Sequence, residues 1–398
     1  MAVTIAAVRR PLCLLPWLLC LPLLASSAPF LPTSDQQVLA TVPARASDPR
    51  ARELVTLRQA WRTQPQDVGA AVALARRYFE EVAAEGDPRY IGYAQAALQP
   101  WWALPRPPVA VRVLRAQLLQ FDHRFDEALA DLDAAVAEQP DNGSAWSWRT
   151  AILMVRADYP RARQSCERMA PLATRLIAAA CLAQVDAISG HAARAAAQLR
   201  SALAKNSQAD AAERLWALTR LAETDERRGD YPAAEAAFRE ALALGEADVY
   251  LRSAYADFLL DRGRPAEVLT LLTDGARADL LLLRLALAAQ AQSDPRAKRW
   301  RDELVARFEA AQRRGDVSHR KEESRFVLAL LGDAPRALAL AQQNFAVQRE
   351  PADARILLEA ALAARQPAAA QPVLDWMAAA GIESVALHGL AGQLKGLR

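Results

Sequence analysis

The sequence predicts an all-α fold, a right-handed superhelical solenoid of antiparallel helix pairs with about eight to nine hairpins. Three observations support it. The 398 residues contain only 15 glycines, and Ala, Leu and Arg, which form helices readily, dominate the chain. Apolar residues recur at three-and-four spacing in segment after segment, whereas strand-like alternation is almost absent. A short sequence phrase also returns 34 residues after its first appearance.

Residues 1–28 differ from the rest and have the features of a signal peptide. "MAVTIAAVRR" ends in two arginines, "PLCLLPWLLCLPLLA" is apolar, and "ASSAPF" supplies small residues, with cleavage expected after Ser27 or Ala28. The bias toward arginine over lysine indicates a bacterial source. We therefore expect Sec export to the periplasm and no membrane span after cleavage. An uncleaved signal would instead anchor the chain in the inner membrane.

Residues 29–65 are expected to form an N-terminal extension with a capping helix. The candidate helix is "DPRARELVTLRQAW", residues 48–61, in which Asp48 and Pro49 provide a cap and a first-turn proline.

The repeated phrase has four positions: an aromatic or similar residue, then a small residue, then an apolar residue and then another small residue. Its best copies are Phe125, Ala128, Leu132 and Ala135; Tyr159, Ala162, Cys166 and Met169; and Tyr231, Ala234, Phe238 and Ala241. Amphipathic segments such as 111–121, 144–155, 212–228 and 248–260 alternate with these copies. The unit is therefore a hairpin of helix A and helix B, and neighbouring hairpins must stack to bury their apolar faces.

The clearest repeats span residues 66–275, and weaker copies span 276–382. The weaker part includes an unusually long helix at 294–314. Residues 383–398 are expected to form a C-terminal capping helix and tail. This helix would cover the apolar end of the array.

The pattern resembles the tetratricopeptide repeat (TPR) family, whose motif runs W-x2-L-G-x2-Y, then A-x3-F, then P. Trp146 occupies the tryptophan position of its repeat, Tyr159 and Ala162 follow in order, and Pro140 closes the preceding repeat. The Leu-Gly pair is replaced, for example by Arg149-Thr150. The resemblance implies an extended peptide or partner helix bound in a concave groove lined by A helices. Helical phase and the resemblance together place these residues at that groove: Ser147, Gln184, Trp216, Thr219, Glu223, Tyr250, Ser253 and Asp257.

Cys166 and Cys181 would remain after signal cleavage, on a B helix and the next A helix. Reflection of Cys166 through the turn near 172–174 brings it close to Cys181, so a disulfide is possible in an oxidising compartment. The alternative is two buried free thiols in positions that need small residues.

No catalytic motif stands out, so we expect a protein that is not an enzyme and uses no cofactor or metal. The four histidines lack metal-ligand spacing, and His123 and His191 are expected to be solvated turn residues. Glu223 and Glu226 lie beside Arg220 and Arg227, which indicates a salt-bridged surface. The net charge of +3 is spread over interspersed acids and arginines, which gives no basic stripe for nucleic acid.

Arg-Gly-Asp occurs at 228–230 and 314–316, where it could be taken for an adhesion motif. Both copies fall between predicted helices. Gly suits a helix C-terminus and Asp a helix N-cap, so both are expected to be turns.

The predicted function is a scaffold or adaptor that binds other proteins in the bacterial periplasm or envelope. The alternative is an accessory subunit of an envelope polysaccharide or transport machine that binds glycan. An aromatic-lined groove would favour glycan, whereas a polar, charged groove with few aromatics favours protein. The sequence favours the protein partner.

Overall fold

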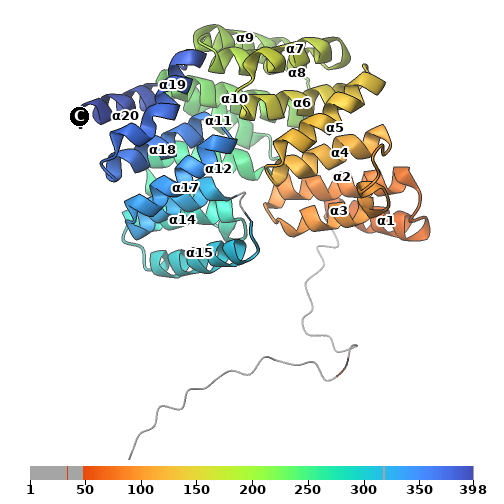
Figure 1. Ribbon diagram of the computed structural model, residues 1–398, viewed down its shortest axis with the longest axis horizontal. Helices are drawn as coiled ribbons and strands as arrows, with labels where there is room; N and C mark the ends of the chain where they lie inside the picture. Colours follow the sequence, from red (N-terminus) through yellow and green to blue (C-terminus); the bar gives the residue numbers. More distant parts are fainter. Residues whose placement is uncertain (1–33, 35–47, 317–318, 398) are drawn as a thin grey trace, which may run out of the picture. The chain divides into compact units, whose positions relative to one another are not determined.

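Helices account for most of the computed structural model, which describes residues 34, 48–316 and 319–397 (Figure 1). No strand occurs in this described part. The predicted signal peptide at 1–28 lies outside it, as do residues 29–33 and 35–47 of the predicted extension. The prediction of an all-α solenoid is confirmed.

The helices from α2 to α19 pair as consecutive hairpins, and α1 and α20 flank them. The bounds are α1 (Pro49–Thr63), α2 (Val68–Glu85), α3 (Arg89–Trp102), α4 (Val109–Phe121), α5 (Phe125–Glu138), α6 (Gly143–Val155), α7 (Tyr159–Met169), α8 (Arg175–Ile188), α9 (Ala192–Lys205), α10 (Ala211–Arg228), α11 (Tyr231–Ala243), α12 (Val249–Asp261), α13 (Pro265–Leu271), α14 (Asp279–Ala291), α15 (Arg296–Arg313), α16 (Arg320–Phe326), α17 (Ala334–Val347), α18 (Pro351–Ala363), α19 (Gln371–Ala380) and α20 (Val385–Lys395). Short 3₁₀ turns follow α7, α13 and α18, and a π-helical turn, Val327–Leu331, extends α16.

The repeated phrase marks the core of each B helix. Ala128, Ala162 and Ala234 are fully buried, which lets the paired helices approach closely, and Phe238 fills the space toward the next helix. One hydrophobic cluster runs from Val109 to Leu394, and a second joins the hairpins between Leu54 and Leu118. The partly buried Trp102 packs against both clusters and links them.

The hairpin tips explain the Arg-Gly-Asp copies. Gly229 ends α10 in the left-handed conformation with φ 81°, and Asp230 caps α11 by accepting from the Ala233 amide. In the second copy, Gly315 follows α15 with φ 71°. The expectation of turn residues holds at both copies.

His123 corrects an expectation, because it is not a freely solvated turn residue. It occupies the left-handed tip position between α4 and α5, with φ 57°, and its ring stacks on that of Phe125 at 5.3 Å. Burial, followed by the charge of Lys321, lowers its pKa from 6.5 to about 4. The imidazole is therefore neutral at physiological pH.

The C-terminal hairpins return to contact the middle of the stack. The Arg349 amide donates to the Val155 carbonyl at 2.8 Å, and the Ala192 amide donates to the Glu383 carboxylate. Figure 1 shows α20, in blue, near the green helix α10, which it contacts. We call this line of contacts the seam. It joins α6 to α10 with the segment from Val347 to α20.

Candidate functional site

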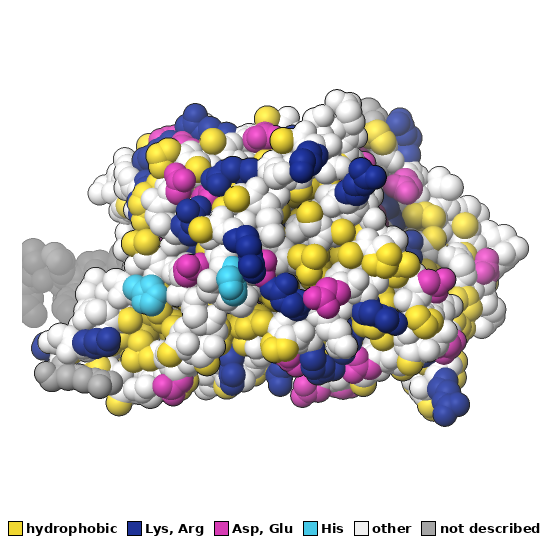
Figure 2. Space-filling view, turned by 90° about the horizontal axis from the view of Figure 1, so that it is seen from above, with side chains coloured by type: hydrophobic (Ala, Val, Ile, Leu, Met, Phe, Trp, Pro, Cys, Tyr) yellow, Lys and Arg dark blue, Asp and Glu magenta, His cyan; other side chains and the backbone are white. Residues whose placement is uncertain are grey.

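The seam borders a partly open cavity of about 340 Å³ within the described helices. Its walls come from α6, α7, α8, α10, α11, α12, α14, α16, α18 and α20, together with the α17–α18 loop. Charged groups of both signs line it: the cations Arg220, Arg227, Arg262, Arg284, Lys321, Arg325, Arg349 and Arg355, and the acids Glu223, Glu226, Asp257, Asp261, Glu322, Glu350 and Glu359. Acids and bases are also interspersed over the face drawn in Figure 2.

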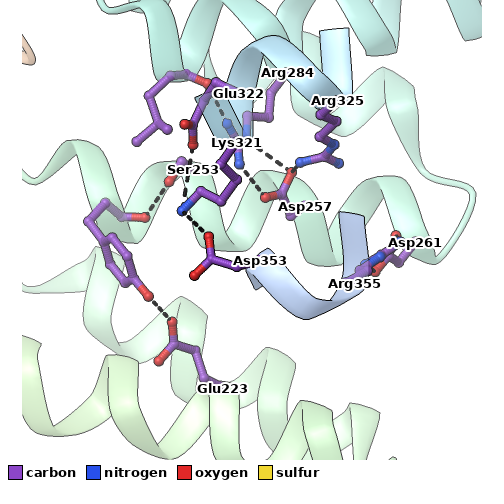
Figure 3. Close-up of polar contacts among 12 residues, drawn as sticks. Glu223, Ser253, Asp257, Asp261, Arg284, Lys321, Glu322, Arg325, Asp353 and Arg355 are labelled. Atoms are coloured by element: carbon purple, nitrogen blue, oxygen red, sulfur yellow. Dashed lines mark hydrogen bonds and ion pairs between the residues drawn. The ribbon is translucent and has the colours of Figure 1, made fainter. Parts of the chain in front are cut away.

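Asp257 lies between two arginines on one wall. Arg284 donates to both of its oxygens at 3.0 and 2.6 Å, and Arg325 donates at 2.6 Å (Figure 3). Burial opposes ionisation of Asp257, but the two guanidinium groups hold its pKa below its usual range. This carboxylate is therefore a fixed anion that ties α12 to α14 and α16.

A second cluster surrounds Lys321. Its ammonium lies 3.7 Å from Glu322 and 4.0 Å from Asp353 (Figure 3). Asp353 is fully buried and accepts from Asn344 and Gln348 as well as from the Glu350 amide. Burial raises the pKa of Asp353 to about 7.

Two carboxyl groups on the cavity face of α10, those of Glu223 and Glu226, differ in their partners. Glu223 accepts a hydrogen bond from the Tyr250 hydroxyl and pairs with Arg220 at 3.1 Å. Glu226 has no such partner among the described residues. Burial, with the nearby charge of Asp261, raises the pKa of Glu226 to about 8. At neutral pH this carboxyl is mostly protonated.

Five of the predicted groove residues line this cavity: Gln184, Glu223, Tyr250, Ser253 and Asp257. The other three do not. Ser147 is exposed elsewhere on α6, and Trp216 is half-buried against the core. Thr219, expected at the groove, instead lies in the core, where its hydroxyl donates to the Leu215 carbonyl.

Sequence analysis missed the cations that α14, α16 and α18 contribute, because the repeats beyond residue 276 are degenerate. It also placed Glu223 and Glu226 on a salt-bridged surface. The structure corrects this, since both line the cavity and only Glu223 has an ion-pair partner among the described residues. The spacing of Arg220, Glu223 and Arg227, three and four residues apart, could have indicated one shared face.

Cys166 and Cys181 form a disulfide between α7 and α8, with Cα atoms 5.7 Å apart. Both residues are buried, beside the Thr150 hydroxyl. The bond therefore ties two consecutive repeats behind the cavity wall.

Two further properties concern only the part of the chain that the structure describes. It holds no group of three or more His, Cys, Asp or Glu side chains arranged to bind a metal ion. None of its helices combines the length and apolar character needed to cross a membrane.

The consecutive hairpins, with phrase residues such as Phe125 and Tyr159 at the start of B helices 34 residues apart, decide the architecture. The chain is a TPR-like repeat protein. No family model matches it, and no curated protein matches it in sequence.

Solved TPR-like structures are similar in fold. A tetratricopeptide repeat protein from Parabacteroides merdae is 13% identical, with a TM-score of 0.38, over 78% of this chain and 98% of that one. The Cut9-Hcn1 structure of the APC/C is 13% identical, with a TM-score of 0.47, over 83% and 63%. This TPR-like chain thus spans less than two thirds of the length of that compared chain.

A Rap protein in complex with Competence and Sporulation Factor is 14% identical, with a TM-score of 0.46, over 87% of this chain and 100% of that one. At these identities the similarity concerns the fold alone. The cavity of this TPR-like protein must be interpreted from its own residues.

Proposed function

We propose that this chain is a non-enzymatic scaffold or adaptor of the bacterial periplasm or envelope that binds a protein partner. The observation that carries the proposal is the charged cavity at the seam, to which helices from the middle and the end of the chain contribute. A TPR-like stack is a rigid frame, so side chains on successive helices are held at defined positions around a bound segment.

The size of the cavity limits the segment that it can hold. Ligand pockets in proteins span roughly 300–1,000 Å³, and 340 Å³ lies at the low end. A helix is about 10 Å across, so a single helical turn would fill the space. We therefore expect a short element of the partner, a few residues or a chain end, rather than a long helix along the concave face.

The glycan alternative has less support from the lining. Sugar binding needs open aromatic faces, but Arg262 lies 3.7 Å over the Tyr231 ring and Arg220 lies 4.8 Å over that of Tyr250. The Tyr159 hydroxyl accepts from Trp376. With these rings engaged, a charged segment suits the cavity better than a sugar.

Two features support export. The predicted signal peptide at 1–28 has the order of charged, apolar and small segments that export requires. The buried Cys166–Cys181 disulfide suits an oxidising compartment such as the periplasm.

Site-specific photo-crosslinking in the source bacterium would test the proposal. A photoreactive residue replaces Gln184 or Ser253, which line the cavity, or Ser147, which is exposed outside it. We expect the same protein to crosslink from both cavity positions and not from residue 147. Crosslinks of equal yield from all three positions, or none from the cavity, would contradict a partner in the cavity. Fractionation of the same cells would test the periplasmic location.

A further inference from the structure

A second, smaller hollow of about 250 Å³ adjoins the charged cavity, and we call it the apolar hollow. Aliphatic side chains from four elements line it: Leu260 of α12, Leu287 of α14, Leu328 of the π-helical turn and Ile356 of α18. Ile356 is buried, whereas the three leucines are half-buried and pack against the edge of the core. Three separate elements thus leave apolar surface open at one place, which is unfavourable in water unless an apolar group covers it.

The π-helical turn forms one wall of the apolar hollow. Val327–Leu331 has the wide π-helical geometry, which is rare in proteins and is often found at functional sites. Leu328 and Ala329 of this turn line the hollow. The Ala329 carbonyl accepts a hydrogen bond from the Gln290 side chain of α14 at 3.4 Å, which ties the rim to that helix.

Three charged residues separate the apolar hollow from the charged cavity, because Arg325, Arg355 and Glu359 line both. Each already has a counter-charge. Arg325 pairs with Asp257 at 2.6 Å. Arg355 donates to Asp261 at 2.8 Å (Figure 3), and it donates to Glu359 at 2.7 Å. With the charged heads engaged in this way, the two arginines offer the hollow mainly their methylene stems.

The volume of the apolar hollow distinguishes between occupants. A molecule of liquid water occupies about 30 Å³ and a methylene group takes similar space, so 250 Å³ holds a chain of roughly eight carbons. A leucine side chain would fill about half of it. A polar group at the inner end would lose its hydrogen bonds to water without gaining others. At the shared wall, by contrast, a polar head can extend into the charged cavity.

We infer that the apolar hollow binds one aliphatic chain of about eight carbons, carried by a lipid-like amphiphile whose polar head lies toward the charged cavity. The inference goes beyond the proposed function, since it assigns a second ligand of another chemical class to a separate hollow. An aliphatic side chain of a protein partner is the competing occupant, and the probes below separate the two.

Titration of the mature chain with short amphiphiles, followed by methyl NMR of its leucine and isoleucine residues, would test the site. The probes are sulfobetaines with hexyl, octyl, decyl and 8-hydroxyoctyl chains, used below the concentrations at which they form micelles, and N-acetyl-leucinamide. Their zwitterionic head suits a cavity lined by charges of both signs. We expect the affinity to rise about fourfold per methylene from hexyl to octyl and then to level off, because longer chains find no further apolar wall.

Two probes test the chemistry of the hollow directly. The 8-hydroxyoctyl chain should bind at least tenfold more weakly than the octyl chain, since its hydroxyl would be buried without a partner. N-acetyl-leucinamide should bind more weakly still. If it binds as tightly as the octyl probe, the occupant is an amino-acid side chain and the inference is overturned. Affinity that rises by the same factor from octyl to decyl indicates unspecific partition onto the surface, which also overturns it.

Substitutions at the rim locate the chain. Ala329→Phe fills the hollow from an exposed position and should abolish binding of the octyl probe. Leu328→Asn makes the wall polar and should weaken binding at least tenfold. Ala306→Phe, at an exposed position of α15 outside the hollow, is the matched control and should bind like the wild type. Wild-type affinity in both Ala329→Phe and Leu328→Asn would contradict the assignment, and urea midpoints would verify that all three variants are folded.

The aliphatic site and the scaffold can fail separately. Binding of the octyl probe that Ala329→Phe abolishes, together with no protein crosslinked from Gln184 or Ser253, would support the site and refute the scaffold. One protein crosslinked from both positions, with no binding of the octyl probe to the wild type, would support the scaffold and refute the aliphatic site.

Discussion

Trp376 of α19 donates its indole N–H to the phenolic oxygen of Tyr159 at the start of α7, at 3.0 Å and across 217 residues of sequence. Both side chains are buried. The bond lies in the seam, close to the contact of Arg349 with Val155. It couples the closure of the stack to the geometry of the cavity, because Tyr159 also lines that cavity.

Loss of this bond should destabilise the closed stack. Tyr159→Phe leaves the buried Trp376 N–H without an acceptor, at a cost of about 1–3 kcal/mol in the free energy of unfolding. Trp376→Phe and the double variant complete a cycle in urea unfolding, and we expect a coupling energy of about 1 kcal/mol. Strictly additive effects would show that the two groups do not interact in solution.

Two glycines meet at the seam. A Cβ built on Gly190 would lie 3.3 Å from the carbonyl oxygen of Gly381, and Gly190 has φ 77°. Gly263 is a matched control, with φ 67° and no atom within 4 Å of its Cβ position. Both substitutions to Ala carry the left-handed penalty of about 1 kcal/mol, and Gly190→Ala should cost roughly 1 kcal/mol more through overpacking. Equal urea midpoints for the two variants would argue against the close contact.

The disulfide should contribute substantially to stability. It closes a loop of 15 residues, for which the chain-entropy model gives about 3 kcal/mol. We expect reductant to lower the urea midpoint of the wild type but not that of the Cys166→Ala, Cys181→Ala double variant. Mass spectrometry of the unreduced chain, after alkylation in denaturant, would reveal free thiols if the bond does not form in the cell.

Glu226 predicts a pH dependence whose sign is defined. Its folded pKa of about 8 lies above the ordinary value of 4.5, so between these values the folded chain holds a proton that the unfolded chain has lost. Its contribution to stability therefore falls as pH rises through that window, by at most about 1.4 kcal/mol per pH unit. Glu226→Gln should gain stability relative to the wild type from pH 5 to 8 and then level off. A constant difference over this range would contradict the raised pKa.

Particular residues show how far sequence could predict the site. Glu223, Tyr250 and Asp257 were expected at the groove from helical phase on two neighbouring A helices, and they line the cavity. Thr219 lies on α10, as Glu223 does, but its short side chain packs inward and donates a hydrogen bond to the Leu215 carbonyl. Phase alone cannot separate the edge of a buried stripe from the groove beside it.

The amino-acid sequence by itself determined the helices, the hairpin period and the turns, since these depend on local propensity, spacing and caps such as Gly229 and Asp230. Tertiary structure alone decided the seam, because small angular changes from one repeat to the next add up over many hairpins. That sum brings Trp376 to Tyr159 and Arg349 to the cavity that Arg227 also lines. No local sequence pattern predicts these long-range contacts, so the charges that line the cavity could be identified only in the folded chain.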